Sequence, residues 1–91
     1  MIIGLNRVYP YAGHEYHIQA EDLGVEQAAF EVRVYEQGTV LWRKRVAYAD
    51  VLDQHLPKTE QEEALRSLME KTVHTVEAAI SKGKLGAAPS S

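Results

Sequence analysis

The chain has 91 residues, of which 45% are hydrophobic, and its formal charge is −3 at pH 7. This length suits one domain with a modest core. Basic and acidic residues are mixed in both halves of the chain. This mixture disfavours nucleic-acid binding, because such binding requires a concentrated cationic surface. The chain has no cysteine, which excludes disulfides, thiolate metal sites and a thiol nucleophile.

The same composition bears on where the protein acts. No apolar run approaches the length of about 20 residues that a membrane-spanning helix needs, and residues 1–11 lack the basic start and long apolar stretch of a signal peptide. Small secreted domains often depend on disulfides. We therefore expect a cytoplasmic protein that makes no use of a membrane.

The first half of the chain alternates polar and apolar residues, which is typical of β-strands. The predicted strands are 2–9, 14–21, 28–35 and 39–47, and Pro10 is expected to end the first. Turns are predicted at Ala12-Gly13 and at Glu36-Gln37-Gly38, with Gly38 in the left-handed conformation. The third strand alternates most cleanly, which places Phe30 on one face of the sheet and Tyr35 on the other.

The second half follows a helical spacing. Residues 50–56 are long enough for one or two helical turns, which Pro57 would end. Thr59 and Glu62 have the spacing of a capping box, which predicts a long helix from Thr59 to about Lys82 with Gly83 as its stop. One sector of this helix is apolar, through Leu65, Leu68, Met69, Thr72, Val73, Val76, Ala79 and Ile80.

These elements predict an α+β domain over 1–82, a four-stranded antiparallel meander packed against one long C-terminal helix, with a flexible tail over 83–91. A helix about 10 Å across cannot cover a sheet nearly 20 Å wide. Either the short helix or a second copy of the chain covers the remainder, so we expect a homodimer. The predicted core consists of Leu5, Ile18, Phe30, Val32, Val34, Val40, Trp42, Leu65, Leu68, Met69, Val76 and Ile80.

The densest cationic run is Arg43-Lys44-Arg45 on the fourth predicted strand. With Arg33 and Tyr35 of the neighbouring strand, Arg43 and Arg45 are the candidate interaction residues on an exposed sheet face. The alternative is a charge-paired, solvated face, because Glu21 and Glu31 are expected to share it. Lys44 should point inward together with Trp42, which suits an edge strand.

Other polar residues offer no catalytic or metal-binding arrangement. His14 and His17 are three residues apart on a strand and therefore face opposite sides, so we expect two surface histidines. Asp22 is expected to cap its loop by accepting a hydrogen bond from a nearby backbone amide. Tyr9, Tyr11 and Tyr16 surround the first hairpin, either as an aromatic patch for self-association or as hairpin packing. We expect no enzyme, no cofactor and no bound metal.

One longer pattern resembles a group of short uncharacterised bacterial proteins. It consists of Tyr16-His17-Ile18-Gln19-Ala20-Glu21-Asp22-Leu23-Gly24, then Gly38-Thr39-Val40-Leu41 and Tyr48-Ala49-Asp50. The group's pattern is close to Y-H-V-Q-T-E-D-x-G, so Ala20 stands where a threonine is typical. The resemblance covers most of 5–82 and implies a compact cytoplasmic bacterial protein, with no assigned activity and no functional residues.

The leading functional hypothesis is therefore a protein-interaction or regulatory module that associates with itself or with another protein. The alternative is a nucleic-acid or nucleotide-binding module that uses Arg33, Arg43 and Arg45.

Overall fold

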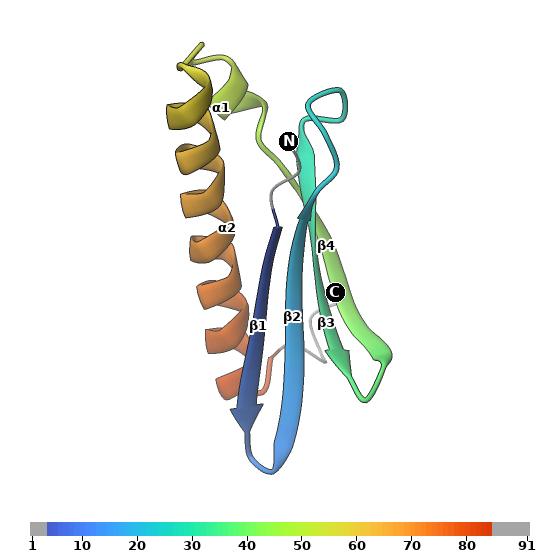
Figure 1. Cartoon of the computed structure of the whole chain (residues 1–91). Coiled ribbons are helices and arrows are strands. Elements are labelled where there is room, and N and C mark those ends of the chain that lie inside the picture. Colours follow the sequence, from blue (N-terminus) through green and yellow to red (C-terminus); the bar gives the residue numbers. More distant parts are fainter. Residues whose placement is uncertain (1–3, 85–91) are drawn as a thin grey trace.

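The computed structural model describes residues 4–84. Its elements are β1 (Gly4–Tyr11), β2 (His14–Asp22), β3 (Ala29–Glu36), β4 (Thr39–Ala47), α1 (Ala49–Leu52) and α2 (Lys58–Ser81). The strands form one antiparallel sheet in the order β1-β2-β3-β4, and α2 runs along one side of it (Figure 1). The predicted α+β meander with a long final helix is confirmed. We call the side of the sheet that faces α2 the inner face, and the opposite side the outer face.

Both predicted hairpin turns are present. Ala12 and Gly13 have φ values of 53° and 82°, and Gln37 and Gly38 have φ values of 52° and 81°. Two successive residues with positive φ form the tight turn whose twist matches that of paired strands. Glycine adopts this conformation without strain at the second position of each turn, which is why these short turns are readable in the sequence.

Two expected boundaries are wrong. The first strand continues through Pro10 to Tyr11, because β1 lies at the edge of the sheet, where a residue without an N–H group is tolerated. The long helix begins at Lys58 with Pro57 as its N-cap, and no side-chain cap is formed. The carbonyl oxygen of Pro57 accepts the N–H of Gln61 at 2.8 Å, so the helix starts before the predicted capping box.

The end of α2 follows the prediction. Gly83 has a φ of 67°, and its N–H donates to the carbonyl oxygen of Ile80 at 3.0 Å. The N–H of Lys84 donates to the carbonyl oxygen of Ala79 at 2.9 Å. These bonds satisfy the last helical carbonyls and reverse the chain. Residues 85–91 of the predicted tail lie outside the described residues.

The core lies between the inner face and α2. Its members are Ile18, Ala20, Phe30, Val32, Val34, Tyr48, Leu65, Met69, Val73, Val76 and Ile80. Leu5, Trp42 and Leu68, three predicted core residues, are half-buried and pack against this cluster. Tyr48 is only 2% exposed and was not predicted, since it follows the last strand without belonging to either periodic pattern.

Val40 is the one predicted core residue that is exposed, at 37%. Val34 pairs with Trp42, but the next residue, Tyr35, pairs with Val40, so Leu41 is an extra residue on β4. Such a β-bulge reverses the alternation of side chains beyond it. Val40 therefore lies on the outer face with Tyr35, while Trp42 remains on the inner face.

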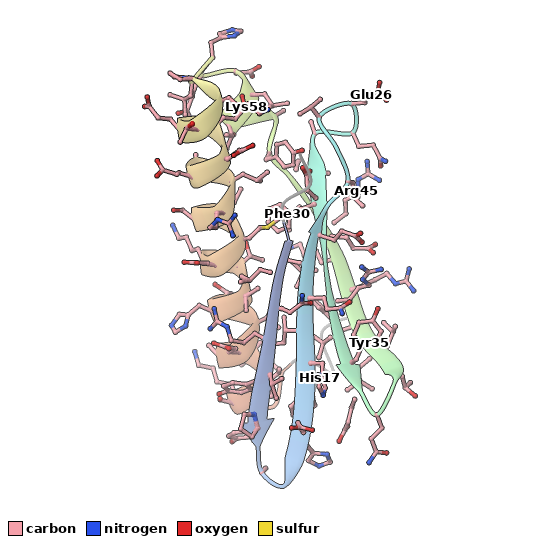
Figure 2. All side chains as sticks on the ribbon, in the orientation of Figure 1. His17, Glu26, Phe30, Tyr35, Arg45 and Lys58 are labelled. Carbon is pink, nitrogen blue, oxygen red and sulfur yellow. The ribbon has the colours of Figure 1, made fainter. Side chains whose placement is uncertain are left out.

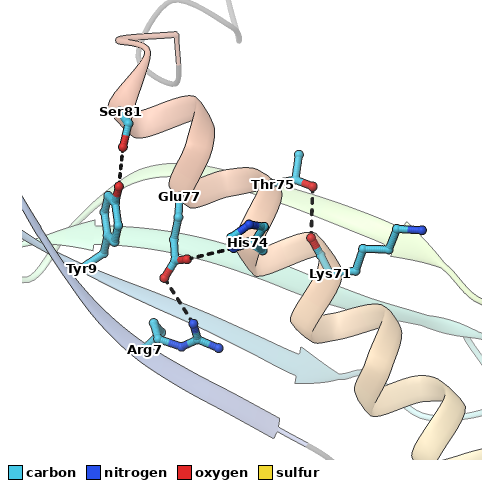
Figure 3. A network of polar contacts seen from close by, with 7 residues as sticks. All are labelled: Arg7, Tyr9, Lys71, His74, Thr75, Glu77 and Ser81. Atoms are coloured by element: carbon cyan, nitrogen blue, oxygen red, sulfur yellow. Dashed lines mark hydrogen bonds and ion pairs between the residues drawn. The ribbon is translucent and has the colours of Figure 1, made fainter.

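Polar contacts attach the end of α2 to β1 (Figure 3). Arg7 Nη1 lies 3.4 Å from Glu77 Oε2, and Glu77 is the only charged residue among the described ones that is buried. The hydroxyl of Tyr9 contacts that of Ser81, and the Tyr11 hydroxyl donates to the Ser81 carbonyl at 2.8 Å. The three contacts fix α2 over the β1 side of the sheet.

This attachment leaves the sheet unevenly covered. Of the four strands, α2 approaches β1 and β2 most closely, and α1 has only four residues and lies against the start of α2. The inner side of β4 is therefore left partly open, as expected from the widths of a helix and a four-stranded sheet. Neither α1 nor α2 has the length and apolar character required to cross a membrane.

Candidate functional site

The outer face of the sheet carries the predicted interaction residues. Register pairs Arg33 with Arg43, and Tyr35 with Val40. Arg45 pairs with Glu31, so all four candidate residues (Arg33, Tyr35, Arg43 and Arg45) share this face. Figure 2 shows Tyr35 and Arg45 on the side of the sheet away from α2, with Phe30 between the sheet and the helix.

Arg33 is held by the acidic residues that were expected to share its face. Its Nη2 atom lies 2.8 Å from Glu21 Oε1 and its Nη1 atom lies 3.5 Å from Glu31 Oε1. The Arg33 side chain is only 25% exposed, and its buried Nε atom has no hydrogen-bond partner. Much of its charge is thus neutralised within the sheet, which reduces its use for binding a phosphate.

Arg43 and Arg45 differ from Arg33 in this respect. Both side chains are exposed, and neither takes part in an ion pair within residues 4–84. Arg45 lies across from Glu31 in register, but that carboxylate is directed to Arg33. The free positive charge of the outer face is therefore concentrated on β4, at one edge of the sheet.

An apolar and aromatic row crosses the outer face beside these charges. Successive strand pairs join Val8 to His17, His17 to Tyr35, and Tyr35 to Val40. We call these four residues the cross-strand row. Val8 is 51% exposed, and Leu41, next to Val40, is 42% exposed. Strict alternation does not predict the row, because the bulge at Leu41 reverses the side to which Val40 points.

A second open region lies between β4 and α2. This β4 groove has a volume of about 420 Å³. It is lined by Lys44, Arg45, Val46, Ala47, Lys71, Thr72 and Thr75. Lys44 faces inward as predicted, since it pairs with buried Val32, but it remains exposed because α2 does not cover it. The groove has three cations in its walls and no carboxylate.

A smaller pocket of about 140 Å³ adjoins Asp22 and Tyr48. The Tyr48 hydroxyl donates to Asp22 Oδ1 at 2.5 Å, and the Gly24 N–H donates to the same oxygen at 2.9 Å. Burial, followed by this hydrogen bond and the charge of Asp22, raises the pKa of Tyr48 well above its ordinary value. Asp22 thus caps its loop as predicted, and additionally holds Tyr48.

The remaining polar candidates lie apart from one another. The side chains of His14 and His17 are 52% and 50% exposed, and they lie on opposite faces, as predicted, because His14 pairs with inner Tyr11 and His17 with outer Val8. His14 contacts Glu36. Among residues 4–84, no three metal-ligating side chains of the His, Cys, Asp and Glu types gather at one place.

The tyrosines of the first hairpin pack within the molecule. The rings of Tyr9 and Tyr11 stack with their centroids 6.4 Å apart, and both hydroxyls reach Ser81 on α2. Tyr16 stacks with His14, with centroids 5.7 Å apart. Of the two readings of this cluster, the structure favours packing of the hairpin and helix.

Comparisons with protein-family models, with curated proteins and with solved structures find no match to this chain. The similarity of residues 16–24 to the bacterial pattern remains a resemblance.

Proposed function

We propose that this chain is a small protein-interaction module that self-associates through the outer face of its sheet. The proposal is carried by the cross-strand row, which spans all four strands on a face that α1 and α2 leave open. Exposed apolar side chains gathered on one surface are typical of protein interfaces. Val8, Val40 and the adjacent Leu41 are each at least 37% exposed.

A second copy of the chain suits this face because the row is complementary to itself. Sheets that pack face to face keep their strands within about 30° of each other. A two-fold axis along the strands, between β2 and β3, places β1 of one copy over β4 of the other. Val8 of one copy then lies opposite Val40 of the other at both ends of the row, and His17 lies opposite Tyr35 in its middle.

The charges of the outer face also permit self-association. Register places three acidic residues on this face, Glu15, Glu21 and Glu31, and three basic residues, Arg33, Arg43 and Arg45. Two such faces have no net repulsion at neutral pH when the histidines are uncharged. A nucleic-acid interface is supported less well, since Arg33 is paired and the acidic residues would lie against the phosphates.

We propose a binding role and no catalytic step. The pocket beside Asp22 and Tyr48, at about 140 Å³, is well below the roughly 300 Å³ of a small-molecule site, and Asp22 already accepts two hydrogen bonds. A cytoplasmic location in a bacterium belongs to the same proposal. It is supported by the absence of cysteine and by the resemblance of residues 16–24.

Light scattering after size-exclusion chromatography tests self-association. We expect the wild-type chain to be a dimer at high micromolar concentration, and the double variant Val8→Glu with Val40→Glu to be a monomer, because it buries like charges in the interface. Val25→Glu is the matched control, since Val25 is 60% exposed in the loop before β3, away from the row. A monomeric wild type, or a double variant that remains dimeric, would overturn the proposal.

A further inference from the structure

The free edge of β4 offers backbone groups to another strand. β4 is the last strand in the order β1-β2-β3-β4, and among residues 4–84 it pairs with β3 alone. In an edge strand, the N–H and C=O groups that point away from the sheet have no strand partner and can pair with an added segment. Thr39–Ala47 has nine residues, and the part of the strand after the bulge at Leu41 keeps a regular register with β3, so a short added strand can pair with it.

The charge of this edge selects an acidic partner. Arg43 and Arg45 are directed to the outer face, and Lys44 to the inner face, so cations stand on both sides of the same strand. Lys71 of α2 adds a fourth cation across the β4 groove. Within the part of the chain that the structure describes, none of the four forms an ion pair.

The β4 groove provides space for the side chains of an added strand. Alternate residues of such a strand would point toward α2 and meet the groove walls, which combine Val46 with Lys44, Lys71 and Thr72. The other residues would point to the outer face beside Arg43 and Arg45. A strand with carboxylates can thus meet a cation on either face while its backbone completes the edge.

We propose that β4 binds an extended acidic segment of another protein as a fifth strand. This inference rests on the proposed role as an interaction module, but it assigns a different surface and a different partner. A second copy of β4 suits this edge poorly, since it brings a further Arg43-Lys44-Arg45 run. The chain's own acidic run at residues 60–63 is helical. A nucleic acid lacks the alternating backbone N–H and C=O groups that pair with an edge strand.

Fluorescence anisotropy with a labelled eight-residue peptide of alternating Glu and Thr, the length of β3, tests the proposal. We expect saturable binding that weakens about tenfold or more in the double variant Lys44→Glu with Arg45→Glu, because like charges then face the peptide. Arg66→Glu is the matched control, since Arg66 is an exposed cation of α2 outside the groove, and it should bind as the wild type does. Circular dichroism confirms that each variant is folded.

Two further probes separate strand addition from simple charge attraction. The same peptide with an N-methyl group at every residue keeps its charge but loses the backbone donors of both strand edges, and we expect its binding to be lost. Binding equal to that of the unmodified peptide would overturn strand addition, and tighter binding of a single-stranded oligonucleotide would assign the edge to nucleic acid. If no peptide binds while light scattering still detects a dimer, this inference fails and the proposed self-association stands.

Discussion

At the scale of single residues, Asp22 joins two distant parts of the chain. It accepts the N–H of Gly24 two residues ahead and the hydroxyl of Tyr48 after the last strand. Asp22 and Gly24 belong to the 16–24 stretch of the pattern described above, and Tyr48 belongs to its 48–50 stretch, so the contact joins two parts of the pattern that are far apart in sequence. The structure gives this pattern a structural role, since Asp22 ties the loop before β3 to the turn into α1.

Because of this contact, the free energy of unfolding should depend on pH in the alkaline range. Folding raises the pKa of Tyr48, so above about pH 10 the unfolded chain loses this proton first. The unfolded state then binds fewer protons than the folded state, and the free energy of unfolding falls as pH rises, by up to about 1.4 kcal/mol per pH unit for this one group. The contribution is fully present below the ordinary tyrosine pKa.

Urea unfolding of Tyr48→Phe at several pH values checks this expectation. At pH 7 the variant should be less stable by about 1.5–3 kcal/mol, the range for a hydrogen bond to a charged group, and the difference from wild type should shrink above about pH 10. Tyr16→Phe is the control, because the Tyr16 hydroxyl forms no hydrogen bond within residues 4–84 and Tyr16 lies outside the cross-strand row. A difference that stays constant with pH would contradict the assignment.

At the scale of elements, periodicity predicted what depends on local sequence. Alternation placed Phe30, Val32 and Val34 in the core, and glycine marked the ends of the hairpins and of α2. The start of α2 could not be read in the same way, because the Thr59 pattern competes with the preceding Pro57. Proline both ends the preceding segment and supplies the carbonyl that the first helical turn requires.

The candidate surface was predictable only in part, because some of its features depend on strand register and on the bulge in β4. Alternation correctly places Arg33, Tyr35 and Arg43 on one face. The expectation that Glu21 and Glu31 share this face is also confirmed, but alternation does not reveal that both contact Arg33, since those contacts depend on the register between β2 and β3. Nor does it reveal Val40 on the same face, because a bulge changes the phase of alternation without an obvious mark at Leu41.

Because of the bulge, the same valine-to-threonine substitution should change the free energy of unfolding by different amounts at Val40 and at Val34. Val40→Thr should change the free energy of unfolding by less than about 0.5 kcal/mol, as for other surface positions. Val34→Thr, in the adjacent strand and fully buried, should cost about 1–3 kcal/mol because its hydroxyl is buried without a partner. Urea unfolding at low protein concentration separates the two. A similar large loss at both positions would place Val40 in the core.

At the scale of the whole molecule, the placement of α2 determines which surfaces are free. Arg7 and Glu77 hold the helix over the β1 side, so the inner side of β4 remains open and the outer face has no described helix on it. The outer face presents the cross-strand row, which is complementary to the row of a second copy. The β4 edge presents cations beside unpaired backbone groups. Self-association and peptide binding can therefore occur on one molecule without excluding each other.

Self-association should also be visible in the stability of the chain. When a dimer unfolds to two separate chains, each tenfold increase in protein concentration stabilises it by about 1.4 kcal/mol of dimer, so the urea midpoint of the wild type should rise with concentration. The double variant Val8→Glu with Val40→Glu should have a midpoint that does not change, and Val25→Glu should follow the wild type. A wild-type midpoint that stays constant over concentrations at which light scattering reports a dimer would contradict this prediction. The outer face would then not contribute to folding, and the cross-strand row would not be the dimer interface.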